Sequence, residues 1–153
     1  MLIYNITRSN ALPVASQDFL SIQGNATRSY CILELDAEGA GTTSAYTEMG
    51  VYRISAVGTT GGGAVTPVPV NVAQPAFGGV VNTTWSAQPT VSGLIHTMPI
   101  NSNGQRYFWR AMPNLSNAIW SPGGGAAAAA AGISIRPITI SGNTSVRVQV
   151  GEI

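Results

Sequence analysis

Apolar and polar residues alternate with a period of two along most of this chain, which is typical of β-strands that bury one face. At the start of the chain, "LIYNI" places Leu2, Tyr4 and Ile6 on one face. Segments with the 3.6-residue period of an amphipathic helix are almost absent. The pattern therefore predicts an all-β protein with little helix.

Short turns between apolar runs predict β-hairpins. The turn "GNAT" separates "DFLSIQ" from "RSYCILEL", and this predicts a hairpin whose second strand points Cys31, Leu33 and Leu35 inward. The other face of that strand would carry Tyr30, Ile32 and Glu34.

Two further turns contain residues that tolerate positive φ. Asn103-Gly104 predicts a two-residue turn that joins the strand ending at Ile100 to a strand through Tyr107 and Trp109. Gly142-Asn143 predicts a C-terminal hairpin in "PITISGNTSVRVQV". In that hairpin Ile138 and Ile140 would face Val146, Val148 and Val150, with Arg147 and Gln149 outward.

Glycine and proline divide the middle of the chain. Residues 58–79, "GTTGGGAVTPVPVNVAQPAFGG", cannot form a central strand, because proline lacks the N–H that a ladder needs. We expect a turn, then an extended edge segment through Val65, Val68 and Val70, then a loop. With the strands on either side, the chain predicts a single-domain β-sandwich over residues 1–153, jelly-roll-like, with eight to ten short antiparallel strands.

The run Ala126–Ala131 is the one candidate helix. Six alanines are too few to hold a helix alone, since isolated helices need about 12–15 residues. Gly123, Gly124 and Gly125 immediately before them oppose helix initiation. We expect a loop or short extended segment, whose small side chains would allow close approach of a neighbouring subunit or simply form a variable surface loop.

The low charge content of the chain says more about its function than any other property of its composition. Only 8% of the residues are charged, the net charge is +1, and all seven cations are arginine. This composition gives no basic surface for nucleic acid and no polybasic attachment to a membrane. No segment is apolar for long enough to span a bilayer, and the N-terminus does not have the pattern of a signal peptide. With so few charges to keep copies apart, we expect part of the surface to be covered by other copies or by a partner.

Residues suited to catalysis are few and scattered. His96 is the single histidine and Cys31 the single cysteine, and we expect neither to be needed for function. Glu34, Asp36 and Glu38 are close in sequence, but their spacing fits a solvated strand end better than a carboxylate pair or a calcium loop. We therefore expect no enzyme activity, no metal and no cofactor.

Aromatic residues leave one alternative open. A strand through residues 107–109 puts Phe108 on one face and Tyr107 and Trp109 on the other. Together with Trp85 and Trp120, these rings could stack on a sugar, although such rings are equally common in cores and protein interfaces.

Two segments of the chain resemble a known group of proteins. "GVYRISAVGTTGGGAVTPVPVNVAQPAFGGVVNTTW", at residues 50–85, and "RPITISGNTSVRVQVGEI", at residues 136–153, are similar to small head proteins of tailed bacteriophages. The matching pattern is a strand with an outward arginine, a Gly/Thr turn, "AVTP", a Pro/Ala/Gly loop and a closing hairpin. The sequence departs from the group in "VPVNV" and in the alanine run.

The resemblance implies a capsid decoration (cement) protein, a β-sandwich without catalytic residues. Its expected partners are the phage major capsid protein and itself, as a homotrimer, on the outer surface of the virion head after synthesis in the bacterial cytoplasm. The alternative is a carbohydrate-binding module of a phage tail or fibre. The residues that we expect at an assembly interface are Val65, Pro67, Val68, Pro69, Phe77, Tyr107, Trp109 and Trp120.

Overall fold

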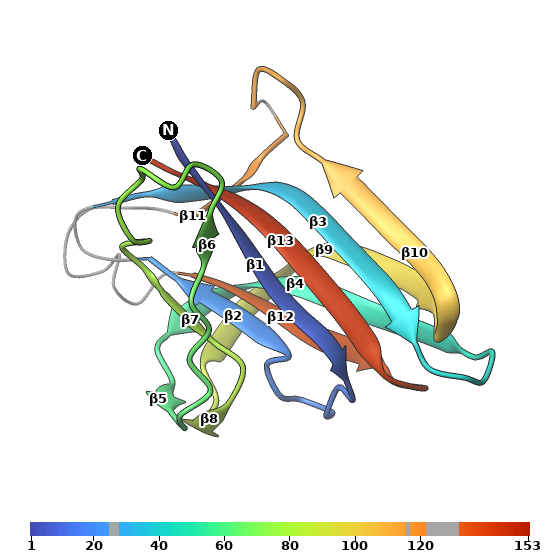
Figure 1. Cartoon of the computed structure of the whole chain (residues 1–153). Helices are drawn as coiled ribbons and strands as arrows, with labels where there is room; N and C mark the ends of the chain where they lie inside the picture. The colour runs from blue at the N-terminus through green and yellow to red at the C-terminus, as the bar shows by residue number, and fades with distance from the viewer. Residues whose placement is uncertain (25–27, 116, 122–131) are drawn as a thin grey trace.

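The structure is a computed structural model that describes residues 1–24, 28–115, 117–121 and 132–153, with the backbone alone for 120 and 121. Within these residues the chain forms strands and no helix, and eight main strands form most of two packed sheets (Figure 1). The main strands have the order β10-β3-β13-β1 in sheet A and β9-β4-β12-β2 in sheet B. Their bounds are β1 Leu2–Ala11, β2 Leu20–Gln23, β3 Tyr30–Ala40, β4 Tyr46–Ala56, β9 Thr90–Asn101, β10 Asn103–Arg110, β12 Gly132–Thr139 and β13 Thr144–Glu152.

The order of these strands is that of a jelly roll. Along the chain each main strand passes to the opposite sheet, except that β4 and β9 are neighbours in sheet B. All pairings between neighbours are antiparallel. The predicted all-β, jelly-roll-like sandwich is therefore confirmed.

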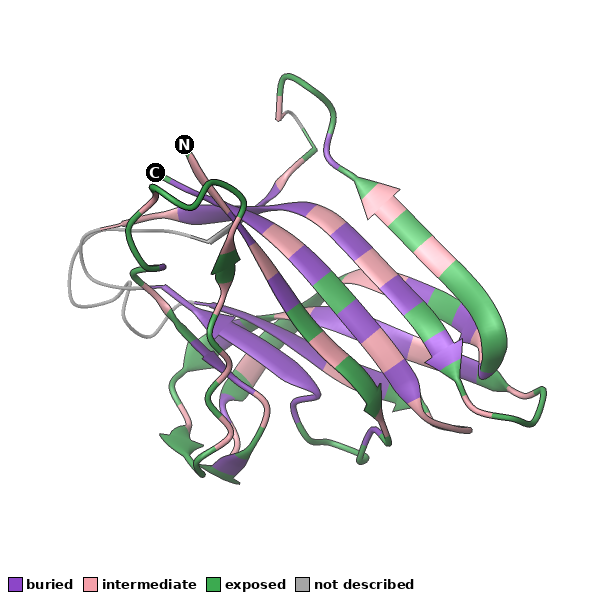
Figure 2. Ribbon diagram, in the orientation of Figure 1, coloured by how far each residue is buried: buried purple, intermediate pink, exposed green. Residues whose placement is uncertain are grey.

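A hydrophobic core fills the space between the two sheets. Figure 2 shows the alternation that produces it, with buried positions banded along β3 and β13. Leu2, Tyr4 and Ile6 share the inner face of β1, as the alternation predicts, with Tyr4 and Ile6 fully buried. The other main strands contribute Leu20, Ile22, Leu35, Met49, Val51, Met98, Ile100, Ile133, Ile135, Val146, Val148 and Val150.

The long connection between β4 and β9 holds four short strands. β6 (Val68–Pro69) extends sheet A beyond β1, and β7 (Val80–Asn82) extends sheet B beyond β2. β5 (Thr59–Thr60) and β8 (Trp85–Ala87) pair as a separate two-stranded ribbon. The expected edge segment is thus present at β6, beside sheet A, and together with β7 the connection covers the edges of both sheets on the same side of the sandwich. A further short strand, β11 (Ile119–Ser121), pairs with β3.

The predicted hairpin around "GNAT" is wrong. β2 pairs with β12 and β7 in sheet B, whereas β3 pairs with β10, β13 and β11 in sheet A. The two strands lie on opposite sides of the core, because a jelly roll sends successive strands to different sheets. The turn itself, at residues 25–27, lies outside the described residues, as does the run Ala126–Ala131.

The hairpin predicted at Asn103-Gly104 is also wrong, because β9 belongs to sheet B and β10 to sheet A. The chain turns between the sheets at Ser102, which is fully buried. The backbone N–H of Ser102 donates to the carbonyl of Ala45 at 2.8 Å, and its hydroxyl donates to the carbonyl of Thr43 at 2.5 Å. Asn103 and Gly104 lie within β10 and do not form the turn; Gly104 has a φ of +76° where the register between β10 and β3 shifts, between Asn103 and Arg106.

The predicted C-terminal hairpin is wrong for the same reason. β12 lies in sheet B and β13 in sheet A, so Gly142 and Asn143 connect the sheets. The outward positions of Arg147 and Gln149 are confirmed, but Ile138 does not face the valines of β13 and is 43% exposed. The register between β12 and β4 shifts beside it, between Pro137 and Thr139.

One β-bulge reverses the predicted faces at the start of β3. Glu34 pairs with Gln149 and Ile32 with Val150, so Leu33 is an extra residue in the ladder. Tyr30 and Ile32 therefore point into the core together with Leu35, which corrects the prediction that Cys31 and Leu33 do so. Cys31 is nevertheless buried, and burial raises the pKa of its thiol.

Candidate interaction surface

Five of the expected interface residues lie in the connection between β4 and β9, and the four before Phe77 differ in exposure. Val68 is exposed, Pro67 and Pro69 are half-buried, and Val65 is half-buried and packs against the core. Val65 also donates its backbone N–H to Val81 of β7 at 2.9 Å. Val65 therefore serves the fold, whereas the other three are available at the edge of sheet A.

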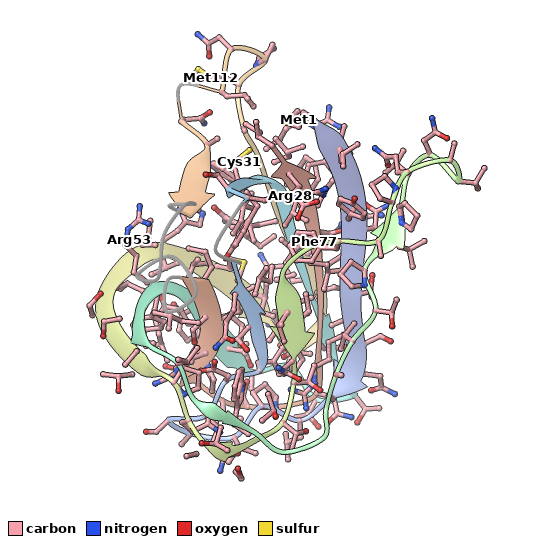
Figure 3. All side chains as sticks on the ribbon, turned by 90° about the vertical axis from the view of Figure 1, so that its left-hand side faces the viewer. Met1, Arg28, Cys31, Arg53, Phe77 and Met112 are labelled. Carbon is pink, nitrogen blue, oxygen red and sulfur yellow. The ribbon has the colours of Figure 1, made fainter. Side chains whose placement is uncertain are left out.

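Phe77, another of the expected interface residues, is buried and belongs to the core rather than to the candidate interface. Its ring is 9% exposed and makes edge-to-face contacts with Tyr4 and Tyr30, with ring centroids 5.3 and 6.0 Å apart. Figure 3 shows it inside the outline of the sandwich, whereas Met112 lies on a loop that projects outward. The ring anchors residues 66–79, here called the strap, to the core.

Hydrogen bonds to both ends of the described chain hold the strap in place. The backbone N–H of Val70 donates to the carbonyl of Ile3 at 2.9 Å, and the hydroxyl of Tyr4 donates to the carbonyl of Pro75 at 2.8 Å. The backbone N–H of Gly78 donates to the buried carboxylate of Glu152 at 2.8 Å. The strap is thus tied to β1 and β13 across its length.

Fixed in this way, the strap presents a row of apolar side chains to solvent. Val68, Val70 and Val72 are all exposed, and Val72 reaches 96%. No Asp, Glu, Lys or Arg occurs between Arg53 and Arg106, a range that spans the strap, the ribbon and β9. The strap itself therefore has exposed apolar side chains and no charged residue.

Sheet A has the opposite character on its outer face. Arg106 donates from Nε and Nη2 to the two carboxylate oxygens of Asp36, at 2.6 and 2.5 Å, and Arg147 reaches Asp36 at 3.1 Å. Arg110 pairs with Glu34. These charges are mostly neutralised by one another and remain hydrated, which is typical of a face that stays in solvent.

Tyr107 and Trp109 are half-buried where β9 and β10 meet at the other side of the sandwich. As predicted, they lie on one face of β10 and exposed Phe108 on the other. His96 of β9 contacts both rings, and its Nε2 is 2.6 Å from the hydroxyl of Tyr107. Burial lowers the pKa of His96.

The proposed sugar platform is not assembled from Trp85. Its ring is 8% exposed beneath the ribbon, where Nε1 donates to Ser21 of β2 at 3.1 Å. β2 and β9 are at opposite ends of the four main strands of sheet B, so Trp85 is remote from Tyr107 and Trp109. The backbone of Trp120 pairs with Cys31 in sheet A, and its side chain lies outside the described residues.

A buried ion pair between Asp18 and Arg136 was not predicted from the sequence. It fixes the connection between β4 and β9 to sheet B, at the end of the connection beside the ribbon. Oδ1 of Asp18 accepts from Ser134 at 2.6 Å and from Nε of Arg136, and Nη2 of Arg136 donates to the carbonyl of Pro89 at 2.5 Å. The side chain of Asp18 has no solvent exposure. Its pKa is raised by desolvation, which the hydrogen bonds from Ser134 and Arg136 oppose.

The sequence gives no direct signal for this pair, because 118 positions separate its partners. Arg8 was missed as well, although it continues the inward series of Leu2, Tyr4 and Ile6. A cation at a position expected to face the core is itself an indication of a special contact.

In the described ranges, no three His, Cys, Asp or Glu side chains are grouped so that they could hold a metal ion. The same part of the chain has no helix long and apolar enough to cross a membrane. Comparisons with protein-family models, with curated proteins and with solved structures find no match to this chain. The fold therefore defines the class of this protein as a jelly-roll β-sandwich with a long, uncharged insertion between β4 and β9.

Proposed function

We propose that this protein is a structural protein of a tailed-bacteriophage head, a decoration protein that binds the assembled shell. It acts as an oligomer, a homotrimer, over the junctions between major capsid subunits on the outer surface. The observation that carries the proposal is the uncharged surface of the strap with its exposed valines. The resemblance of residues 50–85, which include the strap, to phage head proteins supports the same assignment.

Fixed apolar side chains suit a contact with a preformed lattice. The strap is tied to β1 and β13 and anchored by Phe77, so little conformational entropy is lost when it docks. Because the strap itself holds no charged residue, docking on its valines does not require the removal of water from ionised groups of the strap. We therefore expect the contact to depend on apolar burial and on backbone hydrogen bonds.

Such a protein would stabilise a shell by mass action. A ligand that binds only the assembled state stabilises that state by RT ln(1 + [L]/Kd) at each site. An oligomer that spans a junction adds avidity, because the second and third contacts form at high effective concentration. This mechanism requires a rigid docking surface but no catalytic residues.

Co-sedimentation with emptied, expanded heads that lack the protein tests the proposal. We expect the protein to sediment with the heads at both low and high salt, because apolar contacts are little screened. Absence of co-sedimentation, or a monomer in light scattering at the working concentration, would contradict it. If binding is lost at high salt, the phage head remains the partner but the contact is not the apolar one proposed here.

A pair of matched variants tests the surface. Val72→Asp places a charge on a side chain that is 96% exposed, so the fold should be unchanged while binding to heads falls. Thr7→Asp places the same charge on an exposed position of β1 beside Arg147, on the hydrated face of sheet A, and should bind as the wild type does. Equal binding by both variants would show that the strap is not the docking surface.

A further inference from the structure

Arg8 is a cation at an inward position of β1, opposite Val146 of the core. Its side chain is half-buried at the end of the core beside the loop between β1 and β2. Nη1 donates to the backbone carbonyls of Phe19 and, at 3.2 Å, of Thr83. The guanidinium also lies 4.4 Å from the centroid of the Phe19 ring.

These contacts hold the guanidinium in place without neutralising it. Five other arginines form ion pairs, but in the described part of the chain no carboxylate lies within 4.0 Å of Arg8. Burial removes part of the hydration of its charged form and so lowers the pKa of Arg8. A partly desolvated cation without a counter-ion favours an anion.

One edge of the Arg8 guanidinium remains open. Both hydrogen bonds to carbonyls come from Nη1, and no described residue accepts from Nε or Nη2. Arg106 and Arg110 use this same Nε/Nη2 edge to hold the carboxylates of Asp36 and Glu34. That edge presents two parallel N–H groups, which match the two oxygens of a carboxylate.

Arg8 lines a cavity of about 120 Å³ between the β1–β2 loop and the residues that precede β8. Gln17, Thr83 and Thr84 contribute polar groups to its wall, and Asp18 contributes the second charge. Asp18 is already paired with Arg136, so Arg8 supplies the net positive charge at the cavity. The nearby carboxylate of Asp18 still disfavours a dianion such as phosphate.

We propose that this cavity is a binding site for a monoanionic carboxylate, held by Nε and Nη2 of Arg8. The size of the cavity fits a group comparable to acetate or to the end of an Asp or Glu side chain. The same chemistry can therefore come from a free small carboxylate or from an acidic side chain on a docked protein. The site does not depend on the phage assignment.

NMR of the arginine side chains tests the site in the unaltered protein. Sodium acetate is titrated against sodium chloride at equal ionic strength, and the Nε–Hε signals are followed. We expect a saturable shift of the Arg8 signal and no shift of the Arg106 signal, whose Nε–H is already bonded to Asp36. An unmoved Arg8 signal, parallel shifts of all arginines (an adventitious ion only), or tighter binding of inorganic phosphate than of acetate would overturn the proposal.

Two further arms sharpen the result. Arg8→Lys keeps the charge but loses the planar pair of donors, and acetate should bind about tenfold more weakly. If this variant does not fold, the titration of the wild type decides alone. The peptide acetyl-Gly-Asp-Gly-amide is also titrated, with its Asn counterpart as the control. Tighter binding of the Asp peptide than of acetate assigns the site to a protein side chain, and weaker binding than that of acetate assigns it to a free carboxylate.

Discussion

Replacement of Arg136 by methionine would test the buried pair with Asp18. The change removes the cation and keeps most of the side-chain volume, while Asp18 stays fully enclosed. The variant loses the hydrogen bonds from Arg136 to Asp18 and to the carbonyl of Pro89. Only the hydroxyl of Ser134 then remains among the donors described for Oδ1 of Asp18.

The expected cost follows from that burial. Removal of one partner of a buried ion pair costs about 3–5 kcal/mol, because the other charge is left without compensation. Hydrogen bonds to charged groups contribute about 1.5–3 kcal/mol each, so the loss of two is in the same range. For a chain of this size, each kcal/mol lowers Tm by about 2–4 °C, so the fall should be on the order of 10 °C.

Urea unfolding followed by tryptophan fluorescence, at several pH values, measures this cost. The pKa of Asp18 is already raised by desolvation, and it rises further without Arg136, so the folded variant binds a proton more readily than the unfolded chain. Stability of the variant relative to the wild type should therefore improve as pH falls from 7 toward 4. Arg147→Met, on the exposed face of sheet A, is the control and should change stability little. A cost below about 1 kcal/mol, or one that does not change with pH, would refute the reasoning.

Three further outcomes are expected. Phe77→Ala should cost about 3–5 kcal/mol in urea unfolding and should make the strap sensitive to protease, whereas intact protease resistance would show that the ring is not its anchor. Burial lowers the pKa of His96, so the unfolded chain takes up a proton at a higher pH than the folded chain does, and the stability of the fold should decrease as pH drops below about 6.5. His96→Phe should reduce this decrease, and a variant with the pH profile of the wild type would contradict the prediction. Cys31 should not react with a thiol reagent in the native protein and should react fully in denaturant, and prompt native reaction would disprove the burial of its thiol.

The alternation along the chain predicts which residues each strand buries, and much of that prediction holds. Tyr4 and Ile6 face the core, and Val146 and Val148 do so on β13. Alternation fails at Leu33, because a bulge adds one residue to the strand and exchanges its two faces. Nothing in "RSYCILEL" marks the bulge, since apolar residues occupy both faces there.

Strand partners were not predictable in the same way. Asn103-Gly104 permits a tight turn, but the turn does not specify whether the next strand stays in the sheet or crosses to the other. Ser102, whose buried hydrogen bonds fix that crossing, looks like any polar loop residue in the sequence. The sites at Asp18 and Arg8 depend on contacts between segments far apart in sequence, which composition and spacing do not report.

The pairing of β1 with β13 also determines when this chain can fold. Leu2 lies opposite Glu152, and β13 separates β1 from β3 in sheet A. During synthesis β13 is the last strand of sheet A to be made. Until then β1 and β3 each have an edge without a partner strand. Folds dominated by such long-range pairing form in milliseconds to seconds. For a chain with so few charges, this delay is the period of greatest exposure to aggregation, and a ribosome-bound chain stalled before residue 144 should remain unable to complete sheet A.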